Sequence, residues 1–476
     1  MASGGPVLMV LEDLHWSDPQ SVALLREVLR ALREVPLCVL ALARPEVTST
    51  FPALDEVFSQ RIDLRGLSRR AGTRLVHQVL GPQADTEMVN RIVDQAQGNA
   101  LFLEELIRTL AEGKGDQLPE TVMAMLQVRI SRLDVAARRA LRAASVFGEH
   151  FWRGGLAAML GEQPGEIESV LRRLVSLELV ESRSDSRFPG ETEYAFHHAL
   201  LREAAYGLMT DEERVVGHRL AGDYLERVGE LEPLVLASHF ERGAELTRAG
   251  GCYLRASEKA HRGSDRDGTL ACAQRALACG LQGEQQVKLL GLLCEAHAWY
   301  AEWEIARGYA QTVMRLSPPS SGPWARAAVA RFGHALEPER LADFHEVYQT
   351  LAQNPPVEES LAAVGFVLMA ALYILVTAGE FQIAQESLRL LAALVEQYPQ
   401  HVMLRAWNHF TCAVYKAWQA RELAGAQQQA AMACELFREA GFQRGALLAQ
   451  VIFGLSSWLL GDHEAAEREL RATLAG

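Results

Sequence analysis

The sequence lacks any pair of cysteines at a spacing typical of metal binding or redox chemistry. Its seven cysteines are scattered, odd in number and contain no C-x-x-C motif. This pattern predicts reduced thiols within a core, not zinc ligands or disulfides. The N-terminus has no basic flank followed by an apolar run and a small-residue cleavage site. These absences predict a cytoplasmic protein.

The sequence also lacks an excess of basic residues. It has 47 Lys and Arg against 60 Asp and Glu, a net charge of −13. Because nucleic acids and anionic membranes attract positive charge, no nucleic-acid partner and no membrane partner are expected.

One uncharged stretch, Leu361 to Ala378, is long enough to span a bilayer. It has no flanking basic cluster and keeps the register of a helical repeat, so a buried solenoid helix is predicted.

A third absence is a glycine-rich phosphate loop, G-x-x-x-x-G-K-[ST]. The nearest resemblance, Gly113-Lys114-Gly115, lacks the first glycine spacing and the Ser or Thr after lysine. The strand that normally partners such a loop is nevertheless present. Val7 to Leu11 is apolar and ends at Glu12 and Asp13, which predicts a buried parallel strand that brings acids to a phosphate-binding sheet edge. Only six residues precede it, so we expect both ends of the chain to be cut.

A second strand is predicted at Leu37 to Ala43, after an amphipathic helix over Ser21 to Glu34. If the two strands are parallel neighbours, Arg44 lies beside Glu12 and Asp13, where an arginine can stabilise phosphate charge. Two alternatives remain open. Arg44 can be a solvated loop arginine before a proline, and the acidic pair can cap a surface helix.

Three segments together resemble a known family. They are the run LEDLHWSDP at 11–19, the strand ending in ARPE at 43–46, and GNALFLEEL at 98–106. The chain is similar over nearly its whole length to the AAA-type predicted ATPases of the STAND class, which are bacterial signalling proteins. The resemblance implies a nucleotide-binding domain, a helical lid, a winged-helix module and a tetratricopeptide-like sensor, in that order.

The resemblance also implies roles for individual residues. Glu12 would help to hold Mg²⁺, Asp13 would polarise the attacking water and also lie at the metal, and Arg44 would act as the sensor arginine. Gly98, Asn99 and Ala100 would lie near the adenine. Ala100 departs from the family's proline, and alanine lacks the fixed φ of proline. ATP and Mg²⁺ are thus the expected cofactors of an intact parent protein, and none is expected for this chain alone.

The predicted fold is multidomain and mainly α. Residues 1–67 are assigned to the C-terminal part of a P-loop α/β ATPase domain and 68–117 to a helical lid. Residues 118–209 are assigned to a winged helix, and 210–476 to an α-solenoid of TPR-like helix pairs. In the winged-helix segment the expected hairpin pairs Leu179–Ser182 with Tyr194–Phe196. Its candidate recognition helix, Gly165 to Ser176, has no net charge, which argues against DNA binding.

The solenoid assignment depends on a repeat. Origins at Arg266, Ala301, Arg340, Gly379, Arg421 and Gly461 lie 35 to 42 residues apart. Five of them have alanine five positions later, at Ala271, Ala306, Ala384, Ala426 and Ala466. Small residues at fixed places let paired helices approach closely. Such a solenoid suits protein or peptide recognition. Six tryptophans, Trp299, Trp303, Trp324, Trp407, Trp418 and Trp458, are candidates either for its groove or for its core.

The sequence therefore predicts a fragment of a STAND-class signalling ATPase, in which nucleotide state is coupled to a sensing solenoid. Tight ATP binding is not expected, because the phosphate loop is missing. The expected partners are a protein or peptide and the missing P-loop segment or other domains of the parent. The alternatives are a protein-interaction scaffold with a structural ATPase remnant, and part of a transcriptional regulator or kinase whose output domain lies outside the sequence.

Overall fold

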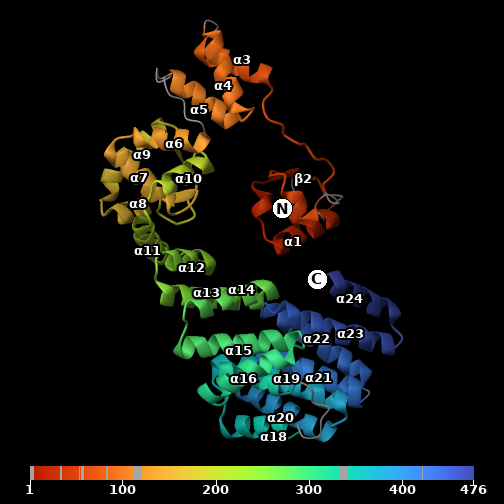
Figure 1. Cartoon of the computed structure of the whole chain (residues 1–476). Coiled ribbons are helices and arrows are strands. Elements are labelled where there is room, and N and C mark those ends of the chain that lie inside the picture. The colour runs from red at the N-terminus through yellow and green to blue at the C-terminus, as the bar shows by residue number, and fades with distance from the viewer. Residues whose placement is uncertain are drawn as a thin grey trace. The chain divides into compact units, whose positions relative to one another are not determined.

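A computed structural model describes residues 5–32, 35–52, 54, 58–81, 84–111, 121–332, 341–420 and 422–475. The chain forms two compact units, residues 1–125 and 126–476, and each is described by itself (Figure 1). The sequence Gly113-Lys114-Gly115 and the expected repeat origins Arg340 and Arg421 lie outside the described residues.

The first unit begins with a small α/β element. Strand β1 (Val7–Leu11) pairs in parallel with β2 (Leu37–Ala41), and Leu11 lies opposite Ala41. Helix α1 (Pro19–Ala31) connects them, and the short helix α2 (Val47–Thr50) follows β2. Both predicted strands and their parallel pairing are confirmed, although β2 ends two residues before the expected Ala43.

The prediction that β1 is buried is wrong: Val7 and Leu11 are half-buried, and the three residues between them are exposed. Met9, Leu11, Leu37 and Val39 face α1 across a small apolar cavity. Leu8, Val10 and Leu40 point to the opposite face and are 63%, 48% and 48% exposed. Parallel sheets are usually covered by helices on both faces, and in the described residues α1 covers only one. Cys38 is exposed for the same reason, so it is not the core thiol that was expected.

Three helices form the next element of this unit. They are α3 (Arg69–Leu80), α4 (Thr86–Ala96) and α5 (Ala100–Ala111). Ser68 and Asp85 accept backbone hydrogen bonds at the starts of α3 and α4, as good N-cap residues do. The helices share a core that includes Val76, Ile92 and Leu106. The helical character predicted for residues 68–117 is confirmed where the structure describes them.

The second unit starts with five helices and a three-stranded sheet. The helices are α6 (Val122–Ser131), α7 (Val135–Ser145), α8 (Arg153–Leu160), α9 (Pro164–Ser176) and α10 (Ala199–Gly207). The antiparallel sheet has the order β3 (His150–Trp152), β5 (Glu193–Phe196), β4 (Val180–Ser182). The predicted hairpin is present as β4 and β5. Strand β3 was not predicted, because three residues are too few to show a strand periodicity.

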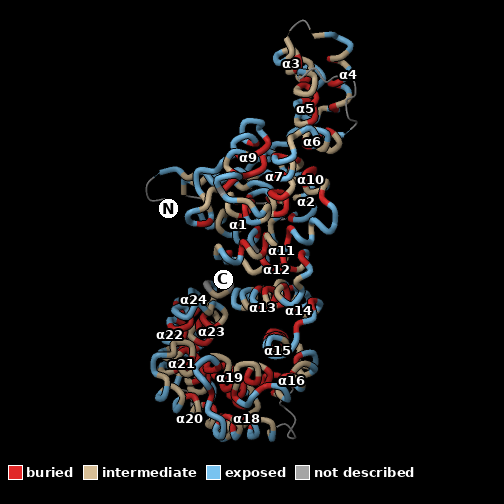
Figure 2. Tube along the Cα trace, turned by 90° about the vertical axis from the view of Figure 1, so that its left-hand side faces the viewer, coloured by how far each residue is buried: buried red, intermediate tan, exposed pale blue. Residues whose placement is uncertain are grey.

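The rest of the second unit is a helical solenoid. Its helices are α11 (Asp211–Arg227), α12 (Pro233–Arg242), α13 (Leu246–Arg262), α14 (Arg266–Ala278), α15 (Gly283–Trp299), α16 (Trp303–Leu316), α17 (Gly322–Ala328), η3 (Val329–Arg331), α18 (Leu341–Gln353), α19 (Leu361–Ala378), α20 (Phe381–Gln397), α21 (Val402–Tyr415), the π-helical η6 (Lys416–Ala420), α22 (Leu423–Glu439), α23 (Gln443–Leu459) and α24 (His463–Ala475). Most consecutive helices pack on one another, whereas α18 packs on α20, and buried residues gather where helices meet (Figure 2).

The same turn recurs along this solenoid. Two residues before a helix starts, the backbone has a positive φ, at Ala244, Ser264, Ala301, Gly379, Gly441 and Gly461. The next N–H donates to the carbonyl five residues back, for example from Glu302 to His297 over 3.0 Å and from Glu380 to Leu375 over 2.8 Å. This is the Schellman hydrogen bond, which satisfies a carbonyl at the end of one helix. Each turn therefore ends one helix and sets the start of the next.

One predicted repeat origin is wrong by two residues. The turn before α14 has its positive φ at Ser264, not at Arg266. Five residues later lies Thr269, which is buried, whereas the expected Ala271 is exposed. At the other turns this position is a buried alanine, at Ala249, Ala306, Ala384, Ala446 and Ala466. Threonine at the equivalent place hid the repeat, because the sequence comparison depended on alanine.

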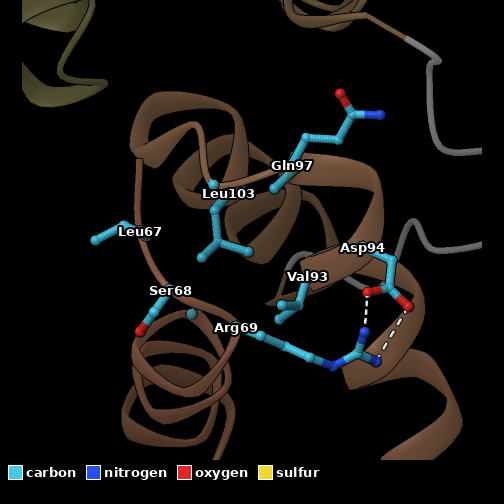
Figure 3. Close-up of a pocket in the computed structure, with 10 residues that line it drawn as sticks. Leu67, Ser68, Arg69, Val93, Asp94, Gln97 and Leu103 are labelled. Atoms are coloured by element: carbon cyan, nitrogen blue, oxygen red, sulfur yellow. Dashed lines mark hydrogen bonds and ion pairs between the residues drawn. The ribbon is translucent and has the colours of Figure 1, made fainter. Parts of the chain in front are cut away.

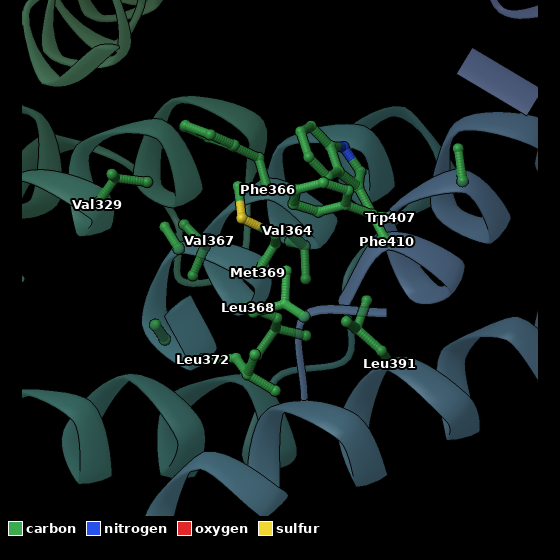
Figure 4. Close-up of a cluster of buried hydrophobic side chains, with 14 of the residues drawn as sticks. Val329, Val364, Phe366, Val367, Leu368, Met369, Leu372, Leu391, Trp407 and Phe410 are labelled. Atoms are coloured by element: carbon green, nitrogen blue, oxygen red, sulfur yellow. The ribbon is translucent and has the colours of Figure 1, made fainter. Parts of the chain in front are cut away.

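The long uncharged stretch forms α19 at the centre of the solenoid core. Leu361, Val364, Leu368 and Leu372 are fully buried among the neighbouring helices (Figure 4). In the described residues, the segment Glu358–Ala378 is long and apolar enough to cross a membrane, but 67% of its most apolar window is buried in the protein. The prediction of a buried solenoid helix is confirmed.

The six tryptophans that were candidates for the groove or the core differ in exposure. Trp324 and Trp407 are buried, and Trp299 and Trp303 are partly buried. Trp418 and Trp458 are exposed.

Candidate functional site

The ends of β1 and β2 are tied together at one edge of the sheet. The N–H of Leu42 donates to the carbonyl of Leu11 over 2.7 Å, and the N–H of Leu14 donates to the carbonyl of Leu42 over 3.0 Å. The residues that follow each strand therefore emerge at the same edge. Glu12 and Asp13 follow β1, and Arg44 follows β2, as the parallel arrangement predicts.

Asp13 has an unusual backbone conformation. Its φ of 51° and ψ of 39° lie in the left-handed region, and it immediately precedes the 3₁₀ helix η1 (Leu14–Trp16). Aspartate tolerates this region better than most residues. The carboxylate is more than half exposed and lies 3.9 Å from Nδ1 of His15. Glu12 is also exposed. Both carboxylates are therefore open to a ligand at this edge.

Arg44 is held by its backbone and by one aromatic ring. Its N–H donates to Nδ1 of His15 over 3.3 Å, and its guanidinium carbon lies 5.8 Å from the ring centroid of Trp16. In the described part of the chain its guanidinium forms no ion pair with Glu12 or Asp13. His15 and Trp16 were not proposed as site residues from the sequence. The signal was present, because both belong to the run LEDLHWSDP.

Whether these residues fit a cation and a phosphate depends on their chemistry. Mg²⁺ is usually bound by one or two carboxylates together with substrate phosphates, and an arginine can neutralise phosphoryl oxygens. Groups of three or more metal-ligating side chains do not occur among the described residues, so Glu12 and Asp13 fit a metal only when phosphate supplies further ligands. The carboxyl edge of parallel strands is a common place for ligand binding, and here two acids and one arginine lie at that edge.

The second set of expected site residues, Gly98, Asn99 and Ala100, lies at the start of α5. Gly98 has a φ of 80°, and its carbonyl accepts the N–H of Leu67 over 2.8 Å. A Cβ at this position would lie 2.9 Å from the carbonyl oxygen of Leu67, so only glycine fits. Asn99 caps α5, because its Oδ1 accepts the N–H of Phe102 over 3.0 Å. Ala100 is the exposed first residue of α5.

A small cavity of about 210 Å³ lies beside this loop (Figure 3). Gly98 and Gln97 line it, whereas Asn99 and Ala100 do not. On its opposite side Arg69 binds both oxygens of Asp94, with Nη2 3.1 Å from Oδ2. Ligand pockets usually exceed about 300 Å³. Gly98 and Asn99 thus have clear structural roles, and their contact with adenine stays a prediction.

Two histidines with lowered pKa values lie elsewhere, in the second unit. Burial lowers the pKa of His218 in α11 to about 4 and that of His239 in α12 to about 3. Their Nδ1 atoms are 3.1 Å apart, and Nε2 of His218 is 2.9 Å from the hydroxyl of Tyr206. Because the three side chains are hydrogen-bonding partners of one another inside a helical core, they link α10, α11 and α12.

No known family profile matches the sequence. An uncharacterized protein of Rhizobium meliloti (strain 1021) is 28% identical over 275 residues, which cover 54% of this chain and 26% of that protein. The chain thus spans about a quarter of that relative's length. Among solved structures, a Signal Transduction ATPase with Numerous Domains (STAND) protein with a tetratricopeptide repeat sensor from Pyrococcus horikoshii is similar over 98% of this chain and 75% of that chain. Its identity is 13% and its TM-score 0.40, a likeness too distant to carry an argument.

Proposed function

We propose that this chain is part of a STAND-class signalling ATPase regulator. The observation that supports it is the shared sheet edge, where parallel pairing brings Arg44 to the same end as Glu12 and Asp13. In this proposal nucleotide bound at the edge biases the conformation of the lid helices and of the α6–α10 module. That module, taken as a winged helix, acts as a spacer to a solenoid that senses a protein or peptide.

Each edge residue has a distinct role in the proposal. Glu12 holds Mg²⁺, Asp13 accepts a hydrogen bond from the attacking water, and Arg44 contacts the γ-phosphate. Bound Mg²⁺ supplies neutralisation of phosphate charge. The left-handed backbone of Asp13 turns the chain sharply after β1 and leaves both carboxylates exposed. Gly98, Asn99 and Ala100 complete the proposed adenine side.

Residues 1–476 alone should not bind ATP tightly, because a glycine-rich loop supplies most phosphate contacts and none occurs in their sequence. We propose that a segment bearing this loop completes the sheet. The exposed apolar face formed by Leu8, Val10 and Leu40 supports this, since parallel sheets are covered on both faces. A cytoplasmic location belongs to the same proposal.

No nucleic-acid partner is part of the proposal. In α9, the guanidinium of Arg173 lies 2.7 Å from Asp134, and Glu168 lies 3.4 Å from Arg153. Side chains that are already paired within the protein have little charge left for phosphates.

The proposal is tested by ATP hydrolysis in the natural polypeptide that carries these residues. Asp13→Asn should lower the rate by roughly 100-fold or more, as expected when a group that positions and activates water is lost. Asp63→Asn is the matched control, because Asp63 is an exposed acid of the same unit that pairs with Arg61. Equal rates for Asp13→Asn and the unchanged protein would exclude the assigned role.

The alternative function is a protein-interaction scaffold in which the sheet is only structural. The long solenoid favours this alternative, because stacked helix pairs present an extended binding surface. Exposed apolar residues such as Trp458 and Leu459 on α23 also favour it. A regulator or kinase output domain would have to lie outside these residues. Micromolar affinity of residues 1–476 for Mg-ATP would reject the scaffold and also our expectation that this chain binds ATP weakly.

A further inference from the structure

A cavity of about 700 Å³ lies between α16 and α18, the second helices of two neighbouring pairs. Its volume is within the range of small-molecule sites. Trp324 of α17 lines it together with Ala310 and Met314 of α16. These three side chains give the cavity an apolar surface between two charged walls.

The α16 wall carries one uncompensated positive charge. Arg307 and Arg315 both line the cavity. Arg307 forms an ion pair with Glu304, one turn earlier on the same helix. Arg315 is exposed and has no ion-pair partner among the residues that the structure describes. Its guanidinium is therefore available to an anion that enters the cavity.

Among the described residues that line the cavity, the α18 side has two acids, Asp343 and Glu346, and one base, Arg331. Asp343 and Glu346 lie one turn apart, and both bind the guanidinium of Arg331, which is 2.8 Å from Glu346. This hydrogen bond raises the pKa of Arg331 and lowers that of Glu346, so both of these groups are charged at neutral pH. Two carboxylates face one guanidinium. The two walls thus bear opposite net charges with an apolar surface between them.

We propose that this cavity binds a short peptide with free ends, its carboxylate at Arg315, its ammonium group at Glu346 and an apolar side chain against Met314 and Trp324. The two charges of a free α-amino acid sit on one carbon, whereas the peptide backbone separates them. The inference rests on the sensing role proposed above for the solenoid. Its test does not involve nucleotide, so either proposal can fail alone.

The test is calorimetric titration of residues 1–476 with the tripeptide Ala-Leu-Ala, in its free form and with its amine acetylated or its carboxylate amidated. Each blocked form should bind about ten-fold more weakly or worse, since each loses a charge-assisted hydrogen bond. Arg315→Ala should weaken the free peptide similarly but should not weaken the amidated one further. Glu346→Gln should show the same non-additivity with the acetylated peptide.

Arg389→Ala is the matched control, because Arg389 is an exposed arginine on α20 that does not line the cavity. It should leave all affinities unchanged. Circular dichroism of each variant checks that the helices are intact. Equal binding of free and blocked peptides would overturn the proposal. So would free leucine that binds as tightly as the tripeptide, or no binding at about 10 mM peptide.

Discussion

The N–H of Arg44 donates a hydrogen bond to Nδ1 of His15 over 3.3 Å, and this bond joins the segment after β2 to the short helix after β1. A nitrogen that accepts cannot carry the proton, so the neutral ring bears it on Nε2, which is buried without a partner in the described residues. The side chain of His15 is only 7% exposed. His15 thus ties the backbone of Arg44 to the segment that follows β1.

Replacing His15 should loosen the backbone at Arg44. In His15→Ala the Arg44 amide should exchange with deuterium about five-fold faster, which corresponds to roughly 1 kcal/mol for one lost hydrogen bond. Trp16→Ala is the control, because Trp16 is largely exposed and its ring lies against the guanidinium of Arg44 and the ring of His15, not against the Arg44 amide. It should leave the amide exchange unchanged. Equal exchange in His15→Ala would show that the bond does not hold Arg44.

The repeated turn predicts an unusual stabilising substitution. Ala301 has a φ of 57°, and the left-handed region costs an L-residue roughly 1–2 kcal/mol, more than glycine loses in the unfolded chain. Ala301→Gly should therefore raise the free energy of unfolding by about 0.5 kcal/mol. Ala306→Gly, five residues later in a helix and fully buried, should lower it by about 1 kcal/mol. Chemical denaturation measures both, and a destabilised Ala301→Gly would contradict the turn geometry.

A glycine in the central helix is required by close packing. A Cβ on Gly365 would lie 2.6 Å from Cδ1 of Trp407, and both residues are buried. Gly365→Ala should lower the free energy of unfolding by about 1–3 kcal/mol through overpacking. Gly308 of α16 has open space around its Cβ position, so Gly308→Ala should raise it by about 0.5–1 kcal/mol. Equal effects of the two substitutions would argue against the α19–α21 packing.

The buried histidine pair predicts acid sensitivity of the second unit. Burial lowers the pKa of His218 and His239 in the folded protein, and Arg242 opposes their protonation further. The unfolded chain therefore binds more protons below pH 6.5, and the free energy of unfolding should fall as pH drops from 6.5 towards 4. Each histidine contributes up to about 1.4 kcal/mol per pH unit.

Denaturant unfolding at pH 7, 6 and 5 measures this slope. The lowered pKa of Glu295, about 2, places its own contribution at lower pH. Substitution of both His218 and His239 by glutamine should flatten the profile, even if stability at pH 7 is reduced. Substitution of the exposed His345 by glutamine should not. An equally steep profile in the double variant would assign the acid sensitivity to other groups.

Sequence patterns located most of the helices and strands, but they did not show which of their residues are buried. The apolar run ending in Glu12 and Asp13 was enough to predict β1 and its parallel partner. Whether Leu8 and Val10 are buried depends on what packs over them, and the run itself does not determine this. Helices α3 and α4 were predictable, because apolar spacing and the caps Ser68 and Asp85 act locally.

Other features depend on contacts between distant segments. The bond from Arg44 to His15 joins residues 29 positions apart, so a local motif did not reveal it. Strand β3 exists only because Phe151 pairs with Tyr194 of β5. The repeat origin at Ser264 was missed because backbone conformation, and not a particular amino acid, is what the turns share.

Calorimetric titration of Mg-ATP tests whether Glu12, Asp13 and Arg44 belong to a nucleotide site. It compares two proteins, residues 1–476 and the natural polypeptide that carries them. We predict no binding at micromolar nucleotide to residues 1–476, because the phosphate loop is absent from their sequence. We predict binding to the natural polypeptide, which Arg44→Ala should weaken. Micromolar binding to residues 1–476, or no binding to either protein, would contradict the proposal that Glu12, Asp13 and Arg44 belong to a nucleotide site.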